Sequence, residues 1–89
     1  MKQITECLDR AFQNKRPLKK KWVAFLEWQQ DVQRPYLYLY HYHHLILIYD
    51  PISYYSLYEW HEKKSDYRGL LAAKKYLNER HYNDKVPSK

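Results

Sequence analysis

The chain has 89 residues and a net charge of +6, and its mean hydropathy is −0.93. This length fits one domain with one core, and no stretch approaches the roughly 20 apolar residues of a membrane-spanning helix. The one cysteine, Cys7, excludes an internal disulfide and any cysteine-based zinc module. We expect Cys7 to be a small helix residue in a cytoplasmic protein without an export signal.

Charged and aromatic residues are unevenly distributed. Residues 36–58 contain no lysine or arginine, one acid (Asp50) and eight of the 11 tyrosines. Residues 1–35 and 59–89 each carry eight Lys/Arg, against four and five acids respectively. A neutral middle between two basic ends indicates an anionic partner, which could be nucleic acid, an anionic membrane surface or an acidic protein surface.

The first predicted element is a helix over residues 3–14, which Arg16-Pro17 would end. Its apolar stripe has helical spacing and consists of Ile4, Cys7, Leu8, Ala11 and Phe12.

Residues 18–30 permit two interpretations, and the strand interpretation covers residues 20–30. As a strand, Trp22, Ala24, Leu26 and Trp28 would line one face, whereas a helix beginning at Pro17 would place Leu18, Trp22, Phe25 and Leu26 on one stripe. Aromatic and β-branched residues favour the strand. A turn or loop is then expected over 31–35.

Residues 36–49 give the clearest pattern. Tyrosines alternate with Leu37, Leu39 and His41, which is the period of a strand, and an apolar run follows over 45–49. The segment is either one bent strand or a hairpin turning at His43-His44. The absence of Gly or Asn counts against a tight turn.

Two further elements complete the chain. Residues 54–61 predict an edge strand, and residues 66–81 predict a helix with Ser65 or Asp66 as its N-cap. A frayed tail is expected over 83–89. The predicted fold class is α+β: a small single domain, residues 1–89, with an antiparallel sheet of three to four strands flanked by an N-terminal and a C-terminal helix. The inner stripe of the last helix is expected to contain Leu70, Ala73, Leu77 and Arg80.

The alternating tyrosines indicate a binding surface. In a strand they must point to one side and Leu37 and Leu39 to the other. The aliphatic side suits the core better, because a buried tyrosine needs a partner for its hydroxyl. Aromatic rings on an open sheet can stack with the bases of single-stranded nucleic acid. Cross-strand packing, or burial in a protein interface, explains the same pattern and is favoured by about three to two in the absence of an RNP-type sequence.

The lysine clusters Lys19-Lys20-Lys21 and Lys63-Lys64 would supply phosphate contacts. The second cluster leads into the last helix, whose N-terminus can bind anions. The order helix, strands, helix with these lysines is similar to the topology of double-stranded RNA-binding domains, although the glycines of that family are absent, since Gly69 is the only glycine. Solvated surface lysines are the favoured explanation of the clusters, by roughly two to one.

One enzymatic hypothesis comes from His41-Tyr42-His43, which resembles the HUH motif. Two strand histidines at i and i+2 face the same side and can hold one divalent metal, and Tyr67 or Tyr76 would attack a DNA phosphate. Because such short patterns recur by chance in a chain rich in His and Tyr, an ordinary pair of strand histidines is the favoured interpretation. We therefore expect no catalytic site, resident metal or cofactor.

The leading functional hypothesis is a non-enzymatic nucleic-acid-associated module with little sequence specificity, for which single strands are the favoured partner. The alternative is a protein-interaction module, an inhibitor or accessory subunit that docks on a larger partner. An HUH-like nicking nuclease has low weight. A homodimer is compatible with the pattern, and no membrane contact is expected. The residues predicted to bind nucleic acid or protein are Tyr36, Tyr38, Tyr40, Tyr42, Lys19, Lys20, Lys21, Arg34, Lys63, Lys64, Arg68, Trp22, Trp28 and Trp60.

Overall fold

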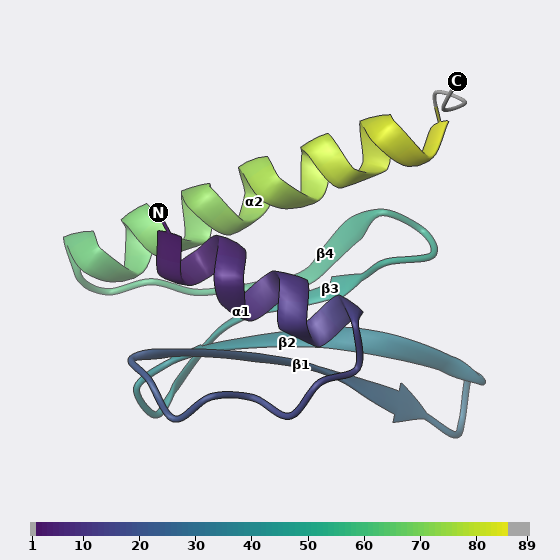
Figure 1. Cartoon of the computed structure of the whole chain (residues 1–89), viewed down its shortest axis with the longest axis horizontal. Helices are drawn as coiled ribbons and strands as arrows, with labels where there is room; N and C mark the ends of the chain where they lie inside the picture. Colours follow the sequence, from purple (N-terminus) through teal and green to yellow (C-terminus); the bar gives the residue numbers. More distant parts are fainter. Residues whose placement is uncertain (1, 86–89) are drawn as a thin grey trace.

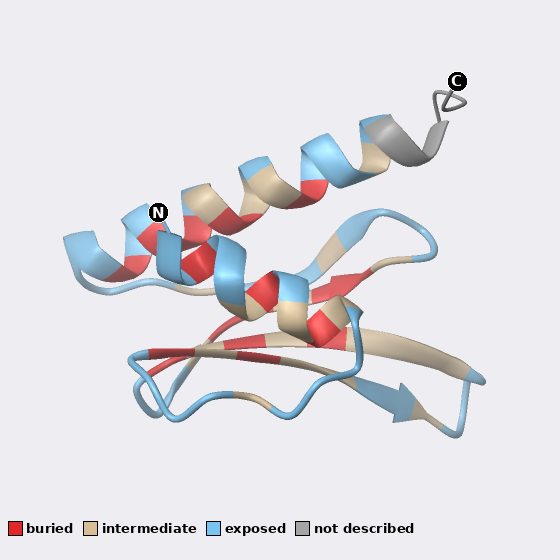
Figure 2. Ribbon diagram, viewed as in Figure 1, coloured by how far each residue is buried: buried red, intermediate tan, exposed pale blue. Residues whose placement is uncertain are grey.

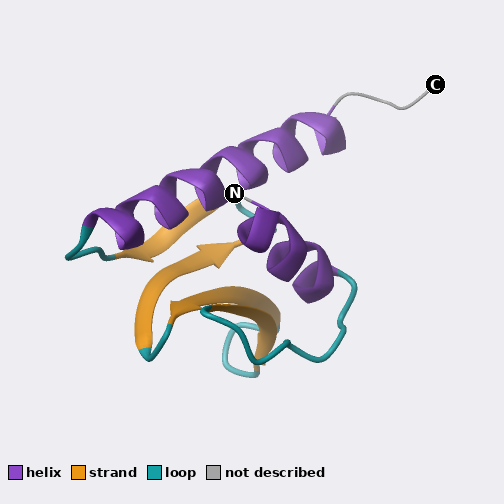
Figure 3. Cartoon of the chain, turned by 60° about the vertical axis from the view of Figure 1, so that its left-hand side comes forward, coloured by secondary structure: helices purple, strands orange, loops and turns teal. Residues whose placement is uncertain are grey.

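Two helices and four strands make up the fold. The computed structural model describes residues 2–85, in the order α1 (Lys2–Phe12), β1 (Trp22–Gln29), β2 (Arg34–His41), β3 (His44–Asp50), β4 (Tyr55–Glu59) and α2 (Lys64–Lys85). The strands form one antiparallel sheet in which each strand pairs with its neighbour in the chain. Both helices lie on the same face of this sheet (Figures 1 and 3). The predicted α+β fold with a helix at each end is confirmed. Within residues 2–85, neither helix combines the length and apolar character that crossing a bilayer requires.

α1 ends earlier than the predicted residue 14, and Asn14 rather than Arg16-Pro17 terminates it. Asn14 adopts a left-handed conformation with φ of 57°. The N–H of Lys15 then donates to the carbonyl of Arg10 (2.9 Å) and the N–H of Asn14 to that of Ala11 (3.0 Å). This is a Schellman ending, which asparagine tolerates better than most non-glycine residues.

Residues 22–29 form β1, so the segment that the pattern left open between helix and strand is a strand. The connection to β2 is shorter than the expected loop over 31–35, because Arg34 and Pro35 already belong to β2. The pairing of β2 with β3 begins only at Leu37. The missing N–H of Pro35 therefore lies beyond that ladder and leaves it intact.

Residues 36–49 form a tight hairpin, not a bent strand. His41 pairs with His44, which leaves a two-residue turn at Tyr42-His43, one position before the expected turn. Tyr42 takes a positive φ of 56°, the conformation for which glycine or asparagine is usually required. Its backbone N–H donates to the carbonyl of Lys21 (2.8 Å), which joins the turn to the start of β1.

A β-bulge in β3 places two consecutive residues in the core. Leu39 pairs with Leu47 and Tyr40 pairs with Leu45, so Ile46 is the extra residue. Ile46 and Leu47 are both fully buried. The bulge explains how a continuous apolar run, instead of an alternating one, fits a sheet that is covered on one face.

α2 is longer than predicted, because it begins two residues before 66 and continues to Lys85. The expected tail is therefore wrong over residues 83–85, and residues 86–89 lie outside the described part of the chain. Asp66 is not the N-cap but lies within the first turn.

The core lies between the helices and the covered face of the sheet, where Figure 2 shows the buried positions on facing sides of the two layers. Leu37 and Leu39 of β2 are fully buried there, as the alternation predicted. Arg80 is exposed, and its guanidinium lies 3.9 Å from the centre of the Phe12 ring. The buried apolar residues are Ile4, Leu8, Ala11, Trp22, Ala24, Leu37, Leu39, Ile46, Leu47, Tyr49, Leu70, Ala73 and Leu77.

Candidate nucleic-acid interface

The face of the sheet opposite the helices, here called the open face, carries the tyrosines of β2. Because paired residues of antiparallel strands point to the same face, the registers assign each strand residue to one side. Leu37, Leu39 and His41 are buried toward the helices, whereas the tyrosines that alternate with them, Tyr36, Tyr38 and Tyr40, are half-buried on the other side. The open face includes Val23, Phe25, Glu27 and Gln29 of β1, Arg34, Tyr36, Tyr38 and Tyr40 of β2, Leu45, Ile48 and Asp50 of β3, and Tyr58 of β4.

Aromatic rings form a row across β1 and β2 on the open face. The centre of the Phe25 ring lies 5.6 Å from that of Tyr38 and 6.0 Å from that of Tyr40, with interplanar angles of 15° and 14°. The Gln29 side chain donates a hydrogen bond to the Tyr38 hydroxyl (3.3 Å). The pKa of Tyr38 is raised mainly by partial burial of its hydroxyl and, to a smaller extent, by the negative charge of Glu27. The rings therefore pack partly against each other and partly face solvent.

Tyr42 is not part of this row. It lies in the hairpin turn, is 57% exposed, and its ring contacts His41 at a centre-to-centre distance of 4.7 Å. The expectation of four tyrosines on one face is therefore wrong for the last of them, because the strand ends at His41.

The two lysine clusters meet at one end of the sheet, here called the basic end and defined by Lys19, Lys20, Lys21, Lys63 and Lys64. The start of β1, the β2–β3 turn and the start of α2 all lie there, on the left in Figure 1. Hydrogen bonds join the three segments: Tyr42 donates to Lys21, and Asp66, which binds the backbone of Lys63, also binds His41 next to Tyr42. All five lysines are exposed.

A carboxylate occupies the N-terminus of α2. Asp66 Oδ2 accepts the backbone N–H groups of Lys63 (2.9 Å) and Glu62 (3.2 Å), and Asp66 Oδ1 lies 2.6 Å from His41 Nδ1. The hydrogen bond to His41, then that from Lys63, lowers the pKa of Asp66 to about 2. A phosphate approaching these N–H groups would meet this negative charge, so phosphate binding at the helix terminus itself is not supported. The side chains of Lys63 and Lys64 remain exposed to solvent.

His41 is buried and held on two sides. Its ring stacks on the indole of Trp22 at 4.0 Å with an interplanar angle of 11°, and its Nδ1 faces Asp66. The contact joins residues 25 positions apart. No local pattern links the two positions, so sequence reasoning missed this pair. The one feature of the sequence that pointed to this site was the position of Asp66 in the first turn of the last helix, where a carboxylate is favoured.

The three tryptophans have different environments. Trp22 is 4% exposed and belongs to the core, which contradicts its assignment as a surface anchor. Trp60 is partly buried against the core, with its ring 5.3 Å from that of His44. Trp28, near the end of β1, is 59% exposed and is the one tryptophan of the three available to a partner.

The two predicted arginines also differ. Arg34 lies 3.1 Å from the buried Asp50 carboxylate and donates to Ser53 (3.3 Å), so its guanidinium fastens β2 to the β3–β4 turn. Arg68 is exposed on α2, four residues after Lys64, and extends the basic end along the same side of the helix.

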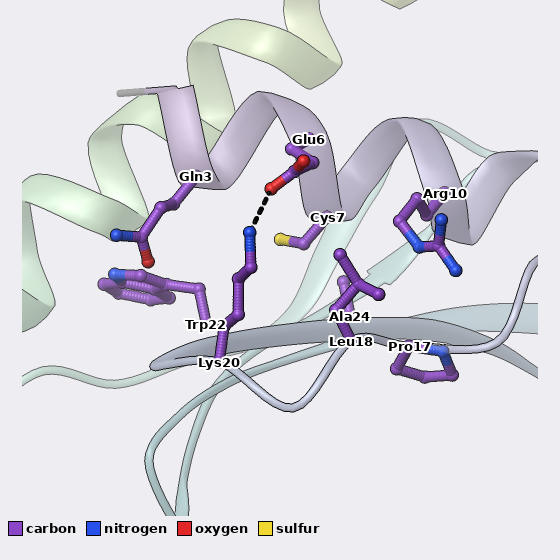
Figure 4. A pocket seen from close by; sticks show the side chains of 9 residues that line it. All are labelled: Gln3, Glu6, Cys7, Arg10, Pro17, Leu18, Lys20, Trp22 and Ala24. Carbon is purple, nitrogen blue, oxygen red and sulfur yellow. Dashed lines mark hydrogen bonds and ion pairs between the residues drawn. The ribbon is translucent and has the colours of Figure 1, made fainter.

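A small groove lies between α1 and the segment that leads into β1 (Figure 4). Lys20 bridges it by an ion pair with Glu6 (3.0 Å), so one lysine of the basic end is partly neutralised. Burial raises the pKa of Cys7, on the α1 side of the groove, to about 12. The groove is lined by Gln3, Glu6, Cys7, Arg10, Pro17, Leu18, Lys20, Trp22 and Ala24.

The geometry does not place His41 and His43 together as metal ligands. His41 faces the helices and binds Asp66, whereas His43 is exposed in the turn. Over residues 2–85, no three His, Cys, Asp or Glu side chains converge as a metal site. Tyr76, a candidate nucleophile, donates its hydroxyl to Asp9 (2.6 Å).

Comparison with known proteins adds no relative from which a role could be transferred: no protein-family model, curated protein or solved structure matches this chain.

Proposed function

We propose that this protein is a small nucleic-acid-binding module that uses the basic end for phosphates and the open face for bases. The supporting observation is that two lysine clusters, about 40 residues apart in the chain, lie at the same end of the sheet, where the aromatic row of the open face ends at Tyr40. Clustered cations attract the phosphate backbone without regard to sequence, and aromatic rings accept bases of every type. The proposal therefore includes little sequence specificity.

No catalytic step is part of the proposal, which describes a binding module in a reducing, cytoplasmic setting. The single cysteine supports that setting, because Cys7 has no second cysteine with which to form an internal disulfide.

Fluorescence anisotropy with labelled DNA and RNA oligonucleotides at two salt concentrations tests the proposal. We expect affinity to fall steeply with salt, because each neutralised phosphate releases counterions. Lys63→Ala/Lys64→Ala should weaken binding and lower the salt slope by about 2, since two phosphates would no longer be neutralised. Absence of binding at low salt would refute the proposal.

A matched control separates a local effect from net charge. Lys15→Ala/Lys75→Ala removes the same charge from exposed positions outside the basic end. This variant should retain most of the affinity and the wild-type salt slope. Equal decreases in affinity in the two double variants would mean that total charge, not the basic end, attracts the ligand.

A protein partner is the second candidate, favoured by apolar side chains exposed away from the basic end. Trp28 (59%), Ile52 (54%), Tyr55 (51%) and Leu57 (41%) would suit such an interface. This candidate predicts a stoichiometric complex that Trp28→Ala weakens and that added salt leaves nearly unchanged. The same candidate covers a homodimer, which sedimentation equilibrium would detect.

A further inference from the structure

Cations and aromatic rings are segregated on the sheet. Within the four strands, Arg34 is the one lysine or arginine, and its guanidinium is engaged with Asp50. The acid Glu27 lies on the open face directly opposite Tyr36. A single-stranded nucleic acid that followed the whole open face would bring its phosphates to a surface without a free cation. At the end of that surface farthest from the basic end, the phosphates would meet the carboxylate of Glu27.

The two ends of the tyrosine row therefore differ. Tyr40 pairs with Val23 and Leu45 and lies two residues from the turn at the basic end. Tyr36 lies about 13 Å farther along β2, at roughly 3.3 Å per residue, beside Glu27. Of the two ends, the Tyr40 end is the one next to the exposed lysines of the basic end, although Lys63 and Lys64 belong to the helix layer on the other face.

We propose that the ligand is a duplex with a short single-stranded overhang, a proposal that rests on the nucleic-acid-binding function. The duplex supplies densely spaced phosphates, one charge per about 1.7 Å of helix axis, and these match the clustered lysines of the basic end. Bases within the duplex are stacked on both sides and offer no free ring face. The first unpaired bases of the overhang do, and they meet Tyr40 and then the neighbouring Phe25–Tyr38 pair.

The test compares three labelled DNA probes with equal total length: a blunt duplex, a duplex with a two-nucleotide overhang, and a single strand. We expect the overhang duplex to bind about tenfold more tightly than either other probe, in line with stacking of one base. The same series in RNA shows whether the preference depends on the sugar.

Substitutions test which residues bind the overhang and which bind the duplex. Tyr40→Leu keeps an apolar strand residue but removes the ring. The affinity of this variant for the overhang duplex should therefore decrease to its affinity for the blunt duplex. Tyr36→Leu is the matched control at the other end of the row and should leave the overhang preference intact. Lys63→Ala/Lys64→Ala should weaken both duplex probes by the same factor. Thermal unfolding of each variant verifies that it is folded at the assay temperature.

The outcomes separate this proposal from the one on which it rests. Tightest binding to the single strand, with equal decreases in affinity in the two tyrosine variants, would overturn the junction proposal and keep nucleic-acid binding. An unchanged preference in folded Tyr40→Leu would also overturn it. Failure of all three probes to bind at low salt would reject nucleic-acid binding itself.

Discussion

The indole of Trp22 lies directly against α2 at Gly69, the only glycine in the chain. A Cβ at position 69 would lie 2.0 Å from the indole carbon Cη2. Alanine is favoured over glycine in a helix by about 1 kcal/mol, yet here it would displace a buried ring that also stacks on His41. The close packing of the sheet against the helix therefore depends on the missing side chain.

Gly69→Ala should lower the free energy of unfolding by about 1–3 kcal/mol, the usual cost of overpacking a core. Urea denaturation followed by tryptophan fluorescence measures this change. Glu79→Ala, at an exposed position of the same helix, should change stability by less than about 0.5 kcal/mol. A stabilised Gly69→Ala protein would show that helix propensity outweighs the packing against Trp22.

Asp66 should make the fold sensitive to acid. Its pKa in the folded protein is about 2, below the ordinary value of 3.8, so its contribution to stability is complete above pH 3.8 and is lost as the pH falls toward 2. Asp66→Asn should flatten the loss of stability in that range, measured by urea denaturation at several pH values. If the variant lost stability between about pH 4 and pH 2 as the wild type does, Asp66 would not be the cause of the acid sensitivity.

Substitution of the turn residue Tyr42 should increase the stability of the fold. Its positive φ of 56° costs a non-glycine residue energy that asparagine largely avoids. Tyr42→Asn should raise the unfolding free energy by about 0.5–1 kcal/mol, the scale of such backbone effects. The substitution also removes the ring that packs on His41, which opposes this gain. A decrease in stability, measured by urea denaturation, would show that the ring packing dominates.

Cys7 should react slowly with thiol reagents. Burial raises the pKa of its thiol to about 12, so little thiolate is present at pH 8. We expect slow reaction with iodoacetamide in the folded protein and rapid reaction in urea, followed by mass spectrometry. Equal rates in the two conditions would show that α1 opens readily at this position.

The regular parts of the fold were predictable because each follows from a local period. Alternation over 36–41 placed Leu37 and Leu39 inward, and the helical stripe placed Leu70, Ala73 and Leu77 in the core. These patterns need no knowledge of distant residues, since backbone geometry alone determines which side chains share a face.

The remaining features depend on interactions that no local pattern encodes. The hairpin turn uses Tyr42 without a glycine, and the carbonyl of Lys21, from another segment, accepts its N–H. His41 finds Asp66 only after α2 has docked on the sheet. Trp22 and Trp28 share the parity of one strand, yet one is buried beneath α2 and the other is exposed near the strand end. Residue type alone predicted a binding anchor at both tryptophans, and this prediction was wrong for Trp22.

The nearest-neighbour order of the four strands has a kinetic implication. Each hairpin closes a loop of only a few residues, so the sheet can assemble stepwise without a large loss of chain entropy. The helices join residues far apart in the chain, as in the bond from Tyr76 to Asp9. We therefore expect formation of the sheet to precede docking of α2, and the basic end, which needs both, to be among the last parts of the molecule to assemble.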